Sequence, residues 1–68
     1  MDYDIENEIK SAYSRSALVD ETIVQVSVNG GHVHLSGIVP FYAMKKEILD
    51  IANKTSGVMD VIDEETIG

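Results

Sequence analysis

Two histidines, His32 and His34, come closer to a metal-binding pattern than any other residues in this 68-residue chain. They stand two positions apart, so both imidazoles point to the same face if the segment is a β-strand. Imidazoles at this spacing could chelate zinc, nickel or copper, with Gln25 or an acid from a neighbouring strand beside them. A metal site ordinarily needs a third protein ligand. The pair is therefore interpreted as part of a polar strand surface, and no cofactor is expected.

The second candidate group is a pair of aromatic residues closely followed by two lysines. At a lipid interface, Phe41 and Tyr42 would enter the headgroup layer, and Lys45 and Lys46 would meet lipid phosphates. These four residues are the predicted lipid or partner contact. The alternative is that Phe41 and Met44 complete the core and leave only Tyr42 exposed.

Acidic residues are abundant but form no catalytic pattern. Twelve Asp and Glu against five Lys and Arg give a net charge of −7, and such charge runs are typical of a solvated face. The sequence has no Ser-His-Asp spacing, phosphate-binding glycine loop or calcium loop, so no catalytic residue is assigned and an enzyme is not expected. The negative charge disfavours nucleic acid as a partner. It also means that any lipid contact must be local and oriented.

A β-hairpin must position both candidate groups, because it holds the histidines and leads into the aromatic segment. Alternating residues from Thr22 to Val28 and from Val33 to Gly37 flank Asn29-Gly30-Gly31, which is typical of a tight turn. The valines and Leu35 share one face, and the opposite face is polar apart from Ile23. The pattern therefore separates a core face from an outer face.

Two registers keep every apolar residue of the hairpin on one face. A turn centred on the two glycines, or a four-residue loop from Asn29 to His32, places Val28 opposite Val33 and Val26 opposite Leu35. A turn at Asn29-Gly30 shifts the partners by two and leaves the faces unchanged. A shift by one residue would place valine opposite histidine throughout and is excluded.

Helices are predicted on both sides of the hairpin, from Asp2 to about Ser14 and from Phe41 to Thr55, because apolar residues recur there at helical spacing. Asp2 and Asp4 are candidate N-caps of the first helix. Leu18 and Val19, in the connection to the hairpin, are expected in the core. The apolar stripes comprise Ile5, Ile9, Ala12 and Tyr13 in the first helix, and Met44, Ile48, Leu49, Ile51 and Ala52 in the second.

A third strand is predicted from Val58 to Ile62, with Ile67 as a candidate continuation beyond the acidic run Asp63-Glu64-Glu65. The segment Ile38-Val39-Pro40 is expected to leave the sheet. The helix of about fifteen residues that follows favours a right-handed crossover between parallel strands. The sequence thus predicts one α+β domain over residues 1–68. Its fold would be a two-layer αββαβ sandwich, a three-stranded mixed sheet with two helices on one face.

This ordered set of motifs resembles the BON domain, which is found in bacterial exported and envelope proteins. The segment Gly31 to Val39 fits the family's Gly-x-Val-x-Leu-x-Gly-x-Val pattern, and Gly57 to Val61 fits its Gly-Val-x-x-Val strand. The resemblance covers about residues 5 to 62. The chain departs from the family at Pro40-Phe41, where a polar pair often opens the second helix. It also departs at Ile48, where a small residue is usual, and at the acidic run of the last strand.

The resemblance implies a non-enzymatic binding module that associates with phospholipid membranes or cell-envelope components. The alternative is a protein–protein interaction or oligomerisation module within a larger protein, using an open sheet edge or the outer face with Ile23 and Ile38. The expected partner is phospholipid or an envelope protein, and the oligomeric state stays open. The chain has no export signal and no apolar run long enough to span a membrane. The expected location is the periplasm or envelope for a piece of an exported protein, and the cytoplasm for a complete chain.

Overall fold

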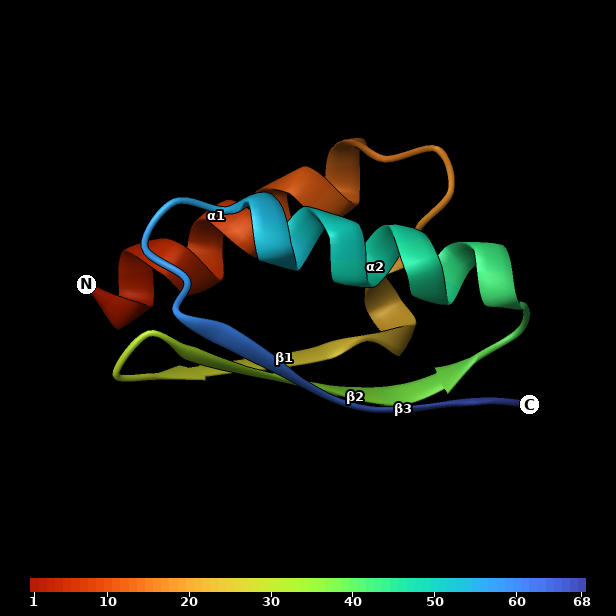
Figure 1. Cartoon of the computed structure of the whole chain (residues 1–68). Helices are drawn as coiled ribbons and strands as arrows, with labels where there is room; N and C mark the ends of the chain where they lie inside the picture. Colours follow the sequence, from red (N-terminus) through yellow and green to blue (C-terminus); the bar gives the residue numbers. More distant parts are fainter.

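The structure, a computed structural model, describes all 68 residues. They fold into a three-stranded sheet with two helices covering one of its faces (Figure 1). Strand β2 is central, antiparallel to β1 and parallel to β3. This arrangement confirms the predicted α+β fold. In chain order the elements are α1 (Asp2–Arg15), the 3-10 turn η1 (Glu21–Ile23), β1 (Gln25–Asn29), β2 (His32–Val39), α2 (Tyr42–Lys54) and β3 (Asp60–Ile67).

The hairpin adopts the first of the two predicted registers. Val28 lies opposite Val33 and Val26 lies opposite Leu35. The two turn residues, Gly30 and Gly31, have φ of 60° and 82°. Positive φ at both positions is what a two-residue type I′ turn requires, and it matches the right-handed twist of the strands.

The core lies between the sheet and the helices, and side chains of β2 form its floor. Val33, Leu35 and Val39 are completely buried, as expected for the central strand of a sheet with one covered face. The hydroxyl of Tyr13 on α1 donates a hydrogen bond of 2.9 Å to the carbonyl of Ile48 on α2. The two helices are therefore joined by a polar contact inside the core. The remaining buried apolar residues are Ile5, Ile9, Met44 and Ala52.

The chain before β1 differs from the prediction, because Thr22 and Ile23 are not in a strand. The Asp20 carboxylate accepts hydrogen bonds from the Thr22 amide at 3.0 Å and from its hydroxyl at 2.6 Å, and this local cap folds the chain into η1. Ile23 consequently packs against the core instead of facing outward. The prediction for Leu18 is also wrong, since its side chain is 49% exposed and Val19 packs against the core in that connection.

The sheet differs from the prediction at the ends of β2 and β3. Ile38 and Val39 remain in β2. The prediction that β3 starts at Val58 is wrong, because the strand begins at Asp60, and it continues through the acidic run to Ile67, the candidate continuation. The parallel pairing of the two strands is continuous from His32 opposite Asp60 to Val39 opposite Ile67. Backbone hydrogen bonding to the central strand thus overrides the low strand propensity of the acids.

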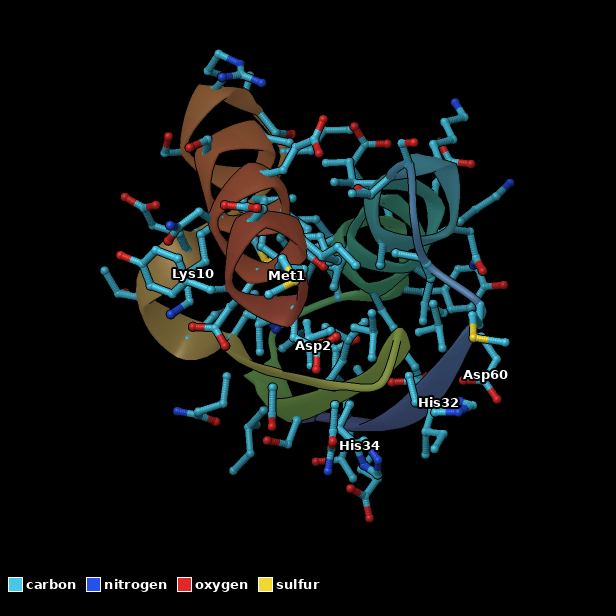
Figure 2. The ribbon with its side chains drawn as sticks, turned by 90° about the vertical axis from the view of Figure 1, so that its left-hand side faces the viewer. Met1, Asp2, Lys10, His32, His34 and Asp60 are labelled. Atoms are coloured by element: carbon cyan, nitrogen blue, oxygen red, sulfur yellow. The ribbon has the colours of Figure 1, made fainter.

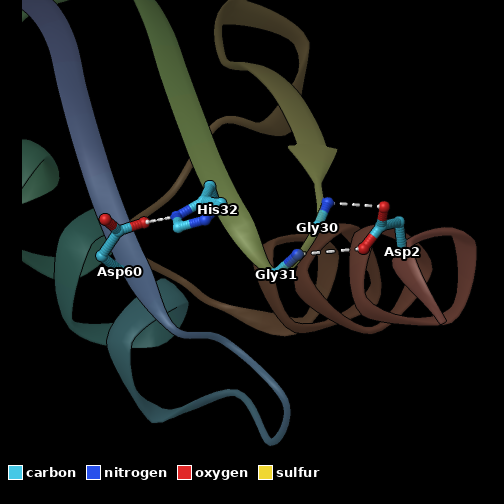
Figure 3. A network of polar contacts seen from close by, with 5 residues as sticks. All are labelled: Asp2, Gly30, Gly31, His32 and Asp60. Carbon is cyan, nitrogen blue, oxygen red and sulfur yellow. Dashed lines mark hydrogen bonds and ion pairs between the residues drawn. The ribbon is translucent and has the colours of Figure 1, made fainter.

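Asp2 does not cap α1, contrary to the prediction, and neither does Asp4, because the N-cap is Met1 without a side-chain hydrogen bond. The Asp2 carboxylate instead accepts hydrogen bonds from the amides of Gly30 at 2.7 Å and Gly31 at 3.1 Å (Figure 3). These two bonds lower the pKa of Asp2, against a small opposing effect of burial. The start of α1 is therefore fastened to the hairpin turn.

We expect Asp2→Asn to release this fastening, because asparagine has a single oxygen and the NH2 group that replaces the other carboxylate oxygen cannot accept a hydrogen bond. The Gly30 and Gly31 amides should exchange with solvent faster in the variant, as measured by NMR, whereas Asp4→Asn should leave them unchanged. The folded state lowers the pKa of Asp2, so its stabilising effect is present above the pKa of the unfolded chain. That effect is lost as pH falls through the folded pKa. Equal exchange in wild type and Asp2→Asn would contradict the assignment.

Candidate functional site

Four large apolar side chains lie exposed at the end of the molecule where β2 and β3 end and α2 begins, the right-hand end of Figure 1. The elements that carry them meet there, with the Ile38 side chain on the uncovered face of the sheet and the Ile67 side chain on the covered face. Val39, the last residue of β2, lies opposite Ile67 of β3, and Phe41 is the N-cap of α2. We call these four residues the α2-start patch: Ile38 (67% exposed), Phe41 (46%), Tyr42 (67%) and Ile67 (49%).

The predicted contact residues divide into two kinds in the structure. Phe41, Tyr42 and Lys46 are exposed, so the aromatic pair belongs to the surface. Met44 lies in the core, which confirms only half of the alternative that placed both Phe41 and Met44 there. The Lys45 ammonium lies 3.4 Å from the Asp63 carboxylate, with both side chains about three-quarters buried (24% and 23% exposed). Lys45 is therefore engaged within the domain.

The charge around the α2-start patch favours an apolar contact over an electrostatic one. Lys45 is neutralised by Asp63, and Lys46 is the remaining lysine of the pair, exposed and without an ion-pair partner. The domain as a whole carries a net charge of −7. Long-range attraction to an anionic surface is therefore weak, and a contact here depends on burying the aromatic and aliphatic side chains.

His32 and His34 lie on the uncovered face of the sheet, as predicted, and each approaches an acid of β3 (Figure 2). The Nδ1 atom of His32 is 2.6 Å from Oδ1 of Asp60 (Figure 3), and Nδ1 of His34 is 3.9 Å from Oε1 of Glu64. No three metal-binding side chains converge on one point. The arrangement is two cross-strand pairs, which link β2 to β3 most strongly when the imidazoles are protonated.

The BON domain family model matches residues 2–68. The chain belongs to the BON family. BON domains are binding modules and are not a known enzyme family. A search of curated proteins finds no match to the chain, and none of its helices has the length and apolarity needed to cross a membrane.

The residues that fit the family pattern support the fold of this BON domain, and its exposed candidate contact residues lie outside that pattern. The matched hairpin supplies the buried floor of the core through Val33, Leu35 and Val39. Ile48, at a position where the family usually has a small residue, is fully buried, and its carbonyl receives the Tyr13 hydroxyl. The departure at Ile48 is therefore accommodated by core packing.

Two polar features of this BON domain escape the sequence reasoning, the Asp2 fastening and the burial of Glu65. Asp2 gives no local signal, because its partners are 28 and 29 residues away. Glu65, in contrast, has a local signal in the sequence. Val61 and Ile67 have the same strand parity as Glu65, so a single strand from Asp60 to Ile67 would place all three on the covered face. That inference requires the acidic run to be read as part of the strand.

Proposed function

We propose that this BON domain is a non-enzymatic module that binds phospholipid membranes of the cell envelope through the α2-start patch. The observation that supports this function is the exposure of two aromatic and two aliphatic side chains at one end of the domain. Aromatic rings suit the membrane interface because they combine an apolar body with, in tyrosine, a polar tip. Lys46 stands one helical turn after Tyr42, where its ammonium can meet a lipid phosphate.

The size of the patch predicts weak and reversible binding. Each side chain still buries part of its surface in the protein, so leaving water contributes about 1 kcal/mol per residue. Four such contributions correspond to a dissociation constant on the order of 1 mM. Stable attachment would then require several copies or a second anchor, as it does for a single acyl chain.

The test is co-sedimentation with vesicles at millimolar lipid, one series of phosphatidylcholine and one containing phosphatidylglycerol. We expect wild-type protein to pellet with both and the double variant Phe41→Ser/Tyr42→Ser to lose at least about fivefold in affinity. Both positions are exposed, and serine is a favourable N-cap at position 41, so the fold should be retained. Lys46→Glu should weaken binding to the phosphatidylglycerol series only.

The matched control is Tyr3→Ser, which removes an aromatic side chain that is at least as exposed (74%) from the start of α1. It should bind vesicles like wild type. Equal binding by the double variant and wild type would exclude the patch, and failure of wild type to bind either vesicle would exclude the lipid function.

The alternative function is a protein contact along the open edge of β1. Both β1 and β3 are edge strands, and an edge strand can pair with a strand of another chain. β1 (Gln25–Asn29) carries no charged residue, whereas β3 carries four acids. Absence of vesicle binding, together with concentration-dependent dimers in sedimentation equilibrium, would favour this function over the first.

A further inference from the structure

Glu65 is an ionisable residue at a buried position on the covered face of the sheet, where apolar residues are usual. It lies in β3 opposite Gly37 of the central strand, and its side chain is 4% exposed. Neither of its carboxyl oxygens has a hydrogen-bond partner. A buried carboxylate without a partner is strongly disfavoured, so such a group either holds a proton or moves toward water.

The groups that face Glu65 cannot neutralise its charge. Lys45 of α2 is the only nearby cation, and its ammonium is already 3.4 Å from the Asp63 carboxylate. Asp63, two residues earlier in β3, adds a second negative charge. Tyr13 of α1 donates its hydroxyl to the Ile48 carbonyl, and Gly37, which lies opposite Glu65 in β2, has no side chain. The single ammonium group of Lys45 therefore cannot balance the negative charges of both Asp63 and Glu65.

These surroundings set the protonation of Glu65 near neutrality. Burial raises its pKa to about 7, with a further contribution from the negative charge of Asp63. The positive charge of Lys45 acts in the opposite direction and is too weak to restore the ordinary value. The same burial, together with the charge of Glu65, raises the pKa of Tyr13, so the phenol stays neutral.

The end of β3 is the part of the sheet that can open when the protonation of Glu65 changes. β3 pairs with β2 on one side only and passes beneath α2 (Figure 1). Thr66, Ile67 and Gly68, which come directly after Glu65, are all exposed. Edge segments with few buried contacts open at low free-energy cost.

We propose that Glu65 is a proton-operated latch: the neutral side chain lets the end of β3 stay packed beneath α2, and loss of the proton releases that end from α2. The released segment includes Ile67, a member of the α2-start patch. The latch itself depends only on the fold, whereas its effect on membrane binding rests on the proposed function.

The experiment is an NMR titration of the intact domain from pH 5 to pH 9 that follows the Glu65 carboxyl carbon and the exchange of the Thr66 and Ile67 amides. We expect the carboxyl to titrate near pH 7 and the two amides to exchange at least tenfold faster above that pH than below it. Titration at an ordinary glutamate value, without a change at these amides, would overturn the latch.

Glu65→Gln provides the matched test of stability, because it keeps the shape of the side chain and removes the ionisation. The folded state raises the pKa of Glu65, so its destabilising effect begins above the ordinary value of 4.5 and is complete above about 7. Between pH 5 and pH 8 the midpoint temperature of wild type should fall about 10 °C further than that of Glu65→Gln. Glu64→Gln, a change at the neighbouring exposed acid, should behave like wild type. The same fall in Glu65→Gln as in wild type would contradict the latch.

Two histidines on the outer face require a second background for this comparison. Histidines in general titrate near neutral pH, so the profiles are also measured with His32→Gln and His34→Gln present, and the difference between glutamate and glutamine at position 65 should persist. Vesicle binding is then measured at pH 5.5 and pH 8.5. A change between these values in wild type that is absent in Glu65→Gln would support the link to the patch. Titration of Glu65 near pH 7 without vesicle binding at either pH would exclude the proposed function and leave the latch standing.

Discussion

Replacing Gly37 with alanine should destabilise the domain by about 3 kcal/mol or more. Gly37 has a φ of 135°, a conformation that side chains strongly disfavour. An added Cβ would also collide with the carbonyl oxygen of Ile23. That carbonyl belongs to the backbone of η1 and cannot move without displacing the start of β1. The measurement is the free energy of unfolding from urea denaturation followed by circular dichroism.

Gly30→Ala is the matched control for this prediction, because Gly30 also has a positive φ but its added Cβ meets no atom closer than 3.7 Å. It should carry only the conformational cost of about 1 to 2 kcal/mol. An equal loss of unfolding free energy in the two alanine variants would show that the close approach of the Ile23 carbonyl does not contribute to the destabilisation.

Truncating Tyr13 to alanine should cost about 4 kcal/mol, the second large effect. The side chain is 1% exposed and packs between the helices and the sheet, so its removal leaves a cavity in the core. A domain of this size has a small total stability, so Tyr13→Ala should be largely unfolded at 37 °C. Urea denaturation at 10 °C, where a folded fraction persists, measures the loss.

The variant Tyr13→Phe separates the contribution of the ring to stability from that of the hydroxyl. The ring stays in place and the hydrogen bond to the Ile48 carbonyl is lost, which should cost about 1 kcal/mol. A loss in Tyr13→Phe as large as in Tyr13→Ala would mean that this hydrogen bond, and not the packing of the ring, joins the helices.

Most of the architecture could be predicted because periodicity is a local signal. The hairpin register follows from alternation, since a shift by one residue would bury the histidines. The buried positions of α2, such as Met44, Ile48 and Ala52, follow from helical spacing. The parallel pairing of β3 follows from the length of the connecting helix.

The errors occur where a contact distant in sequence or a local polar cap decides the conformation. The Asp20 cap turns Thr22 and Ile23 out of the strand, although both have high strand propensity. The extent of β3 depends on its pairing with β2, and the acids of β3 conceal that pairing in the sequence. Propensity alone cannot reveal either effect.

The candidate site was predictable in type but not in detail. The sequence singles out Phe41 and Tyr42, and the structure exposes both. Their lipid-binding role stays a prediction. The engagement of Lys45 by Asp63 could not be predicted, because it requires Asp63 to lie on the covered face of an extended β3. The latch residue Glu65 was missed for the same reason.

The acids of β3 also bear on self-association. β3 is an eight-residue edge strand, and an edge of that length is a template for aggregation unless charge protects it. Asp60 and Glu64 project from the uncovered side of this strand, so two copies that approached edge to edge would bring like charges together. Asp60 and Glu64 therefore protect this edge against fibrillar pairing. That protection weakens as the carboxylates take up protons and the solution approaches the isoelectric point of about 4.4.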